Sequence, residues 1–364
     1  MAEARHLGGK LTRLRRPELS GLRPAAGSVE GALVRLDAGG APQDWPPSLK
    51  KACLEALGAA SWHHPQAAEE TLRELIADRA GLPVASTALF SQGDVALAAL
   101  LTAWCWQGRL AYATPTHLEY ARVAQVLGIT PIAVLSQADF SLPVAQLVGV
   151  ARQHQVRLIL VSNPSEPSGT LVTREEVLTI ARATDAIVVV DERHLTFGEF
   201  TLADAVLEEE NLVVVQGLGN AVAAGAWGVA WVLGAAEVIG EVEKVRGATP
   251  LPAAASLAAA WALQHQAALS PPTSELAARR EALRGALAEL EGVVTWPSVA
   301  HYMLVGTTMP GEALARCLRD QGIVVQAFDR SPLRTCIRVG LSTPAENDAF
   351  LSAMRTLFRR APHP

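Results

Sequence analysis

The middle of the chain alternates short, wholly apolar runs with longer stretches in which apolar residues recur at helical spacing. The apolar runs are rich in valine, isoleucine and leucine, and their length suits strands that are covered on both faces. One helix between them begins with Thr173 and Glu176 at the spacing of a capping box. The seven predicted strands are residues 87–90, 109–113, 131–135, 157–161, 186–190, 212–215 and 228–233. This alternation indicates an α/β fold, a mixed, mostly parallel seven-stranded sheet wrapped by helices.

The pattern changes near residue 249, where alanine-rich helical stretches replace the alternation. The predicted elements beyond it are helices at 252–268 and 274–290, strands at 293–296, 302–305 and 336–341, and a last helix from Pro344. This order is typical of a smaller α+β domain. We therefore expect an N-terminal arm with part of the small domain at 1–60, a large domain at 61–250 and a C-terminal small domain at 251–364.

Composition excludes several classes of protein. The 364 residues are 50% hydrophobic and 18% charged, which is typical of a globular protein and not of a disordered one. A net charge of −5 gives no reason to expect a nucleic-acid partner, and no apolar run of about twenty residues predicts a membrane span. The four cysteines are widely separated and suit a reducing compartment. We expect a cytoplasmic protein.

Polar and glycine residues follow the predicted strands directly. They are residues 91–94, 114–117, 162–164, 191–192 and 217–220. In open α/β sheets, ligands bind in the crevice beyond the carboxyl ends of the strands. The sequence therefore predicts a small-molecule site at this edge of the sheet.

Short motifs lie in a fixed order along the chain. They are His6-Leu-Gly-Gly9, Pro115-Thr-His117-Leu-Glu-Tyr120, Asn163-Pro-Ser-Glu-Pro-Ser-Gly169, Asp191-Glu-Arg-His194, and Ile337-Arg338-Val339 with residues 343–347 after it. The last four resemble P-T-Y-x-x-Y, N-P-N-N-P-T-G, D-E-A-Y and L-R-I…T-x-E-E-N of the fold-type I pyridoxal-phosphate-dependent aminotransferases of class I/II. The chain is most similar to the histidinol-phosphate aminotransferases and threonine-phosphate decarboxylases, from about residue 34 to 358. This resemblance implies a homodimer.

The resemblance also implies roles for individual side chains. Asp191 takes the place of the carboxylate that pairs with the cofactor's pyridinium nitrogen, and Arg338 that of the arginine that grips the substrate's carboxylate. Gly93, followed by Asp94, stands at the start of the helix that faces the phosphate. The other pocket positions carried over are Asn163, Glu166 for the ring-hydroxyl asparagine, and His117, His194 and His64 for three tyrosines, the last sent by the dimer partner. A loop-capping Asp191 and a strand-paired Arg338 are alternatives that stay open.

The family's Ser-x-Ser-Lys turn is replaced in this chain. Asn220 stands at the position of the Schiff-base lysine, and Gly217 and Gly219 stand at the two serines. Eight residues beyond the lysine position, Gly228 replaces a phosphate-binding arginine. An amide nitrogen is neither basic nor nucleophilic, so Asn220 cannot form an imine. We expect no intact catalytic set and no cofactor, since pyridoxal phosphate is implied by the resemblance only.

Two interpretations of function follow. In the first, the protein has lost transamination and serves as a scaffold or binds a small molecule, with Arg338 suited to a carboxylate. In the second, it remains an enzyme: an aminotransferase or amino-acid-phosphate decarboxylase that holds pyridoxal phosphate non-covalently, or new histidine chemistry. His64, His117 and His194 could surround one cavity with Glu166 and Asp191. Imidazole and carboxylate are acid–base groups and metal ligands, but the spacing alone assigns no metal.

Overall fold

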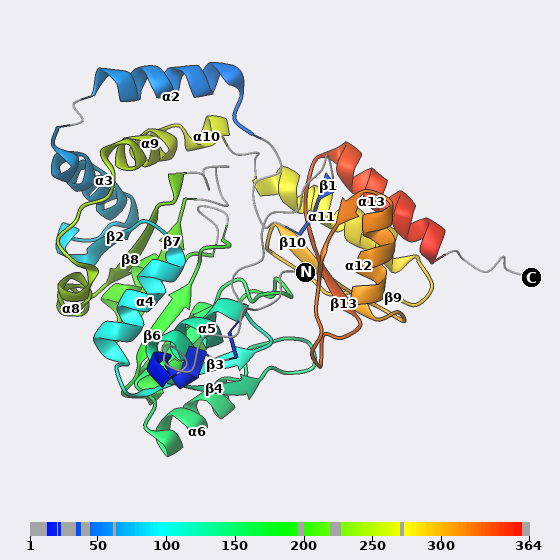
Figure 1. Ribbon diagram of the computed structural model, residues 1–364, viewed down its shortest axis with the longest axis horizontal. Coiled ribbons are helices and arrows are strands. Elements are labelled where there is room, and N and C mark those ends of the chain that lie inside the picture. Colours follow the sequence, from blue (N-terminus) through cyan, green and yellow to red (C-terminus); the bar gives the residue numbers. More distant parts are fainter. Residues whose placement is uncertain are drawn as a thin grey trace, which may run out of the picture.

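The computed structural model describes residues 13–19, 21–22, 34–37, 44–60, 63–195, 200–218, 227–269 and 273–358. A mixed seven-stranded sheet forms the larger part of it (Figure 1). In spatial order its strands are β2 (Thr87–Phe90), β8 (Ala230–Gly234), β7 (Leu212–Gly217), β6 (Ile187–Asp191), β5 (Leu158–Ser162), β3 (Arg109–Thr114) and β4 (Thr130–Leu135). The strands from β7 to β4 are parallel, and β8 runs antiparallel to both of its neighbours. The predicted fold class is confirmed.

Helices cover both faces of this sheet, because the side chains of its strands are apolar on both sides. In β6, Val188 and Val190 pack into one core while Val189, which points the other way, packs into a second. The first face is covered by α2 (Pro47–Ala59), α3 (Pro65–Ala80), α6 (Val144–His154), α7 (Arg174–Ala183) and α9 (Ala253–Gln264). The second is covered by α4 (Gly93–Trp104), α5 (Leu118–Leu127) and α8 (Ala236–Arg246).

The predicted capping box is present at the start of α7. The Thr173 hydroxyl accepts the N–H of Glu176 at 3.3 Å, and the Glu176 carboxylate accepts the N–H of Thr173 at 2.8 Å. Just before it, the side-chain oxygen of Asn163 accepts the N–H of Val172 at 3.1 Å. These contacts fix both ends of the loop between β5 and α7. That loop carries Glu166 into the site.

A second, antiparallel sheet belongs to the smaller α+β part (Figure 1). Its strands, in order, are β12 (Gln326–Ala327), β13 (Cys336–Gly340), β10 (Tyr302–Thr307) and β9 (Val293–Thr295). The helices α11 (Thr273–Ala288), α12 (Gly311–Asp320) and α13 (Pro344–Leu357) share its apolar core. A separate parallel pair joins β1 (Val34–Arg35) to β11 (Ile323–Val324). Short 3-10 turns lie at Pro17–Leu19, Val84–Ser86 and Ala203–Leu207.

Two helical details differ from the sequence-based expectation. The single helix expected at 252–268 is divided into α9 and α10 (Gln266–Leu269), with a break at His265. In addition, α9 packs beside α3 and α2 over the large sheet (Figure 1), although its residues fall within the range assigned to the small domain. The domain boundaries at residues 60 and 250 stay a prediction.

None of the described helices combines the length and the apolar character that crossing a bilayer needs. Cys53, Cys105 and Cys336 are buried, Cys317 is half-buried, and all four are free thiols. They fill space in the core, as small apolar residues do.

Candidate functional site

The carboxyl ends of four neighbouring strands, β3, β5, β6 and β7, meet at one edge of the large sheet. His117 follows β3, Asn163 and Glu166 follow β5, Asp191 ends β6 with His194 after it, and Gly217 ends β7. Arg338 reaches the same place from β13 of the small sheet, where its guanidinium meets Glu166. The structure thus brings together five of the side chains singled out from sequence: His117, Glu166, Asp191, His194 and Arg338.

Asp191 is buried, and donors from the chain itself occupy the hydrogen-bonding positions of its carboxylate. Its Oδ1 accepts the backbone N–H of Arg193 at 3.2 Å and Nε of the same residue at 2.8 Å. Its Oδ2 accepts Nη2 of Arg193 at 2.6 Å and the hydroxyl of Tyr120 at 2.8 Å. An ionised carboxylate has about four acceptor positions. All four are taken by Arg193 and Tyr120.

This pairing decides the charge of Asp191. Burial by itself raises the pKa of a carboxyl, but the guanidinium of Arg193 outweighs burial and holds the pKa of Asp191 well below its usual value. For Arg193, burial works to lower the pKa, and the charge of Asp191 raises it above its usual value. Burial also raises the pKa of Tyr120 well above its usual value. Asp191 and Arg193 therefore form a buried ion pair at neutral pH.

The side chain of Arg193 lies across the start of α4. A Cβ added to Gly93 would stand 2.0 Å from Cδ of Arg193 and 2.5 Å from its Nη1. At Gly217, an added Cβ would stand 3.8 Å from Cγ of Arg193, an ordinary contact. Asp94 is exposed, and its charge also raises the pKa of Arg193. Arg193 therefore occupies the space in front of the helix start, where the resemblance places a phosphate.

Glu166 and Arg338 form a second buried ion pair. Nη1 of Arg338 lies 2.6 Å from Oε1 of Glu166, and both side chains are 8% exposed. Nη2 of Arg338 donates to the backbone oxygen of Asp37 at 2.8 Å, and its guanidinium stands 5.1 Å from the centre of the Tyr302 ring. The carboxylate of Glu166 thus pairs with Arg338, the residue to which the resemblance assigns the carboxylate of a substrate.

Two imidazoles face the other oxygen of Glu166. Nε2 of His194 lies 3.3 Å and Nε2 of His117 lies 3.6 Å from Oε2, which has no hydrogen-bond partner among the described residues. Burial alone would raise the pKa of Glu166, but His194, His117 and Arg338 lower it to about 2. Burial lowers the pKa of His117. Glu166 is therefore ionised, and its Oε2 faces two imidazole nitrogens.

The other residues of the predicted site have different surroundings. His64 is exposed at the start of α3. Gly228 has φ +56°, and an added Cβ would stand 2.8 Å from the backbone oxygen of Ser91. Asn163 uses its side-chain oxygen to hold the loop to α7. The remaining two positions, Gly219 and Asn220, fall outside the residues that the structure describes.

Sequence reasoning missed several residues of the site. Arg193 lies in the motif Asp191-Glu-Arg-His194, and no role was predicted for it. The available signal was a long cationic side chain at the position where the family motif D-E-A-Y has alanine. Tyr120 lies in the motif that begins at Pro115, and its hydrogen bond to Asp191 was not predicted. His301 carries no spacing signal in the sequence, but it is 6% exposed and its ring centre lies 5.6 Å from that of His194. Nothing in the spacing marks Asp37, whose backbone oxygen meets Arg338.

The described lysines are Lys50, Lys51 and Lys244. All three are exposed on the outer helices α2 and α8, and Lys244 pairs with Glu241. None of them reaches the edge of the sheet where Asp191 and Glu166 lie. Within the described part of the chain, no lysine lies at this edge of the sheet.

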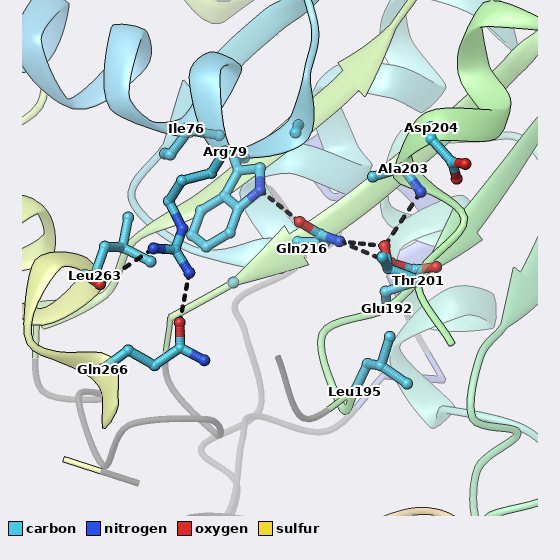
Figure 2. A pocket seen from close by; sticks show the side chains of 13 residues that line it. Ile76, Arg79, Glu192, Leu195, Thr201, Ala203, Asp204, Gln216, Leu263 and Gln266 are labelled. Carbon is cyan, nitrogen blue, oxygen red and sulfur yellow. Dashed lines mark hydrogen bonds between the residues drawn. The ribbon is translucent and has the colours of Figure 1, made fainter. Parts of the chain in front are cut away.

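Glu192 lines a separate cavity of about 320 Å³ (Figure 2). Its carboxylate accepts the Thr201 hydroxyl at 2.7 Å, the N–H of Leu202 at 2.7 Å and the amide of Gln216 at 2.8 Å. Figure 2 shows Gln216 pointing toward Thr201 and Glu192. Burial raises the pKa of Glu192 to about 7, more than these three donors lower it. Glu192 is thus half-protonated near neutral pH.

We expect Glu192→Gln to change the pH dependence of stability. Because the folded pKa of about 7 lies above the usual 4.5, the folded state holds its proton more tightly and loses stability as pH rises between these values. The variant lacks this loss. Its free energy of unfolding, relative to that of the wild type, should therefore rise by about 3 kcal/mol over that range. Urea unfolding measured at a series of pH values checks this, and parallel curves for the two proteins would contradict it.

Comparison with known proteins agrees with this architecture. Residues 32–354 match the family model described as aminotransferase class I and II. A histidinol-phosphate aminotransferase 2 from Nitrosococcus oceani is 28% identical over 346 residues, which are 93% of this chain and 96% of that protein. The histidinol-phosphate aminotransferase of Clostridium acetobutylicum superposes with a TM-score of 0.81 at 14% identity, over 90% of this chain and all of that one.

A third similar protein was solved with a bound ligand. It is a histidinol-phosphate aminotransferase from Sinorhizobium meliloti in complex with pyridoxal-5'-phosphate, with a TM-score of 0.76 and 19% identity. The superposition covers 89% of this chain and 91% of that one. Likeness at such identity shows the fold, while the match to the family model extends over most of the sequence. The chain belongs to the aminotransferase class I and II family.

Proposed function

We propose that this family member does not carry out transamination, and that it acts as a scaffold or binds a small molecule without pyridoxal phosphate. The family resemblance supports a homodimer, in which the residue at His64 faces the partner. The four free cysteines support a cytoplasmic location. The pairing of Arg193 with Asp191 is the observation that supports this proposal most directly.

That pairing removes what the cofactor ring needs. A pyridinium nitrogen binds an Asp carboxylate that has a free acceptor position. On Asp191, Arg193 and Tyr120 fill all four positions, and the guanidinium supplies the positive charge that a pyridinium would bring. Entry of the ring therefore requires breaking a buried, bidentate ion pair, which is strongly unfavourable. The described residues do not fit the cofactor.

The phosphate side gives independent support. A cofactor phosphate needs several donors and positive charge, and the start of α4 is filled by the side chain of Arg193. Gly228, at the family's arginine position, has a left-handed φ, and an added Cβ would lie 2.6 Å from Nε2 of Gln92. An arginine would be strained there. Position 228 therefore does not accommodate the arginine that the resemblance places there.

Among the described residues, no lysine offers a suitable amine. Asn220 stands at the lysine position of the sequence, and the described lysines lie on the outside of the molecule. Without a primary amine, no Schiff base links the aldehyde to the chain. Together with the ion pair on Asp191, this supports the proposal that the protein binds pyridoxal phosphate neither covalently nor non-covalently.

A small molecule has room beside the cluster. A cavity of about 740 Å³ lies between His117 with the start of α5 and the segment 327–333 of the small domain. Arg338 is held by Glu166, so a ligand carboxylate would have to displace that side chain to reach it. We therefore propose that a ligand binds in this cavity, and not on Arg338 as the resemblance implies.

The second candidate function is a retained enzyme activity. It is favoured by the persistence of Asp191 and Arg338 at their family positions and by the convergence of His117 and His194 on Glu166. It predicts either non-covalent binding of pyridoxal phosphate or turnover of histidinol phosphate or an amino-acid phosphate. Both outcomes are measurable on the same purified protein.

We expect no cofactor binding when pyridoxal phosphate is titrated into the full-length protein. Absorbance spectra should be the sum of the free components, equilibrium dialysis should show no saturable uptake, and borohydride should trap no peptide at the site. An active histidinol-phosphate aminotransferase serves as the positive control. A stoichiometric trapped adduct would reject the proposal, and saturable uptake without an adduct would support the non-covalent alternative.

A further inference from the structure

We infer that His117, His194 and Glu166 form a binding site for one divalent metal ion of the zinc type. Each of the three residues offers one ligand atom, and these atoms all lie within 4.8 Å of one another. The atoms nearest to each other are Oε2 of Glu166 and Nε2 of each imidazole. They come from three separate segments, after β3, after β6 and after β5. The sequence assigned no metal here because these segments are brought together only by the fold.

The spacing of these atoms suits tetrahedral zinc. Zinc bonds imidazole nitrogen and carboxylate oxygen at about 2.0–2.2 Å, so two ligands of a tetrahedral ion stand about 3.3–3.5 Å apart. The observed separations from Oε2 are 3.3 Å to His194 and 3.6 Å to His117. In an octahedral site with bonds of that length, neighbouring ligands would stand only about 3 Å apart. Two imidazoles and one carboxylate also select zinc over Mg²⁺ and Ca²⁺, which prefer oxygen ligands.

The carboxylate is held in position for such an ion. Glu166 is 6% exposed, and its Oε2 has no hydrogen-bond partner among the described residues although it is buried. A buried oxygen that accepts nothing is rare and needs an explanation. Arg338 holds Oε1 at 2.6 Å and thereby turns Oε2 toward the two imidazoles, as outer-shell partners of metal ligands do. A metal ion would give Oε2 a direct ligand bond in place of its longer contacts with the two imidazoles.

Two features set limits on the site. Nδ1 of His117 accepts the N–H of Glu119 at 3.2 Å, so binding metal through Nε2 moves the imidazole proton to Nδ1 and gives up this contact. The zinc–nitrogen bond is much stronger than one long capping hydrogen bond. Arg338 also shares Glu166, and its charge lowers the affinity below that of an unshared carboxylate.

The fourth position of the ion faces accessible space. The side chains of His117 and His194 are 24% and 14% exposed, so ions and water reach the cluster. His117 also lines the cavity of about 740 Å³. Three protein ligands with an open position toward a cavity are the arrangement of zinc sites that bind a water or a substrate.

The test measures zinc on the metal-stripped, full-length protein without pyridoxal phosphate, so its result is independent of whether transamination is lost. Equilibrium dialysis with metal analysis should find one tightly bound Zn²⁺ per chain and no bound Mg²⁺. His194→Gln and the double variant His117→Gln/His194→Gln should lower the zinc affinity by more than the roughly 10- to 100-fold that outer-shell changes cause. His154→Gln, at an exposed histidine in the last turn of α6, is the matched control and should leave binding unchanged.

Equal zinc binding by the wild type and the double variant would overturn the inference. If the variants fail to fold, Co²⁺ added to the wild type decides: an intense visible spectrum of four-coordinate Co²⁺ supports the site. A weak spectrum of the octahedral aqueous type shows that the three side chains only form ion pairs, and rejects it.

Discussion

Replacing Arg193 by alanine is expected to lower the free energy of unfolding by about 3–5 kcal/mol at neutral pH. The side chain makes a bidentate ion pair with Asp191, which is 3% exposed, and fills the space in front of Gly93. Its removal leaves a buried carboxylate with only the Tyr120 hydroxyl and one backbone N–H as donors. Urea unfolding of the two proteins measures the difference.

The pH dependence separates the lost charge from lost packing. In the wild type, the pKa of Asp191 is lowered, so its contribution to stability is present above the usual value of 3.8 and is lost as pH falls through the lower folded value. In Arg193→Ala, burial raises the pKa of Asp191 instead, so the variant gains stability as pH falls and the carboxyl is protonated. The deficit should be larger at neutral than at mildly acidic pH.

Two control variants calibrate this result. Arg193→Lys keeps the charge and should lose less stability than Arg193→Ala. Arg122→Ala removes an arginine whose contact with Glu119 is 3.8 Å long, with both side chains more than a third exposed, and it should change stability by about 0–1 kcal/mol. A deficit for Arg193→Ala no larger than that of Arg122→Ala, or one that does not vary with pH, would show that the buried pair has little energetic weight.

The fold was largely predictable because the large sheet is buried on both faces. Its strands are continuous apolar runs, as in Val188-Val189-Val190, and such runs are visible without any knowledge of their partners. Strand ends moved by one or two residues, for example from 228–233 to Ala230–Gly234, because hydrogen bonding to neighbours sets the ends. The two-residue strands β1, β11 and β12 were not predicted, since two residues show no period.

The location of the candidate site was also predictable, but its internal pairing was not. The site lies at the carboxyl edge of the parallel strands, where their polar ends indicated it. The resemblance assigned Asp191 to a pyridinium and Arg338 to a ligand carboxylate, with a loop-capping Asp191 and a strand-paired Arg338 left open. In the structure, both are paired with charged side chains of the same chain. Glu166 and Arg338 are 172 residues apart, and no local spacing rule links them. Only Arg193, two residues from Asp191, was within reach of a local argument.

Both pairings follow one electrostatic pattern. The resemblance to the family implies that Asp191 would bind a cationic ring and that Arg338 would bind a substrate carboxylate. Here Arg193 brings a cation to Asp191, and Glu166 brings a carboxylate to Arg338. Each buried charge is thereby neutralised without any ligand, which satisfies the requirement that buried ions be paired. The charges of the pocket are therefore balanced without a ligand, and we expect that one substitution alone does not open it to the cofactor.

We accordingly expect that Asn220→Lys alone does not restore a covalent cofactor, whereas Asn220→Lys combined with Arg193→Ala does. The lysine supplies the amine, and the second change frees the acceptors of Asp191 and clears the space in front of Gly93. Alanine is also the residue that the family motif D-E-A-Y carries at this position. The two effects should be strongly non-additive, because each change is ineffective without the other.

The measurement is borohydride trapping of pyridoxal phosphate followed by peptide mapping, which separates an adduct at residue 220 from reaction at exposed lysines such as Lys244. The expected result is no site-specific adduct in either single variant and saturable labelling of residue 220 in the double variant. Asn220→Ala/Arg193→Ala, which opens the pocket without an amine, is the matched control and should stay unlabelled. Full labelling of Asn220→Lys alone would show that the ion pair on Asp191 yields readily to the cofactor, and that the missing amine by itself separates this chain from its catalytic relatives.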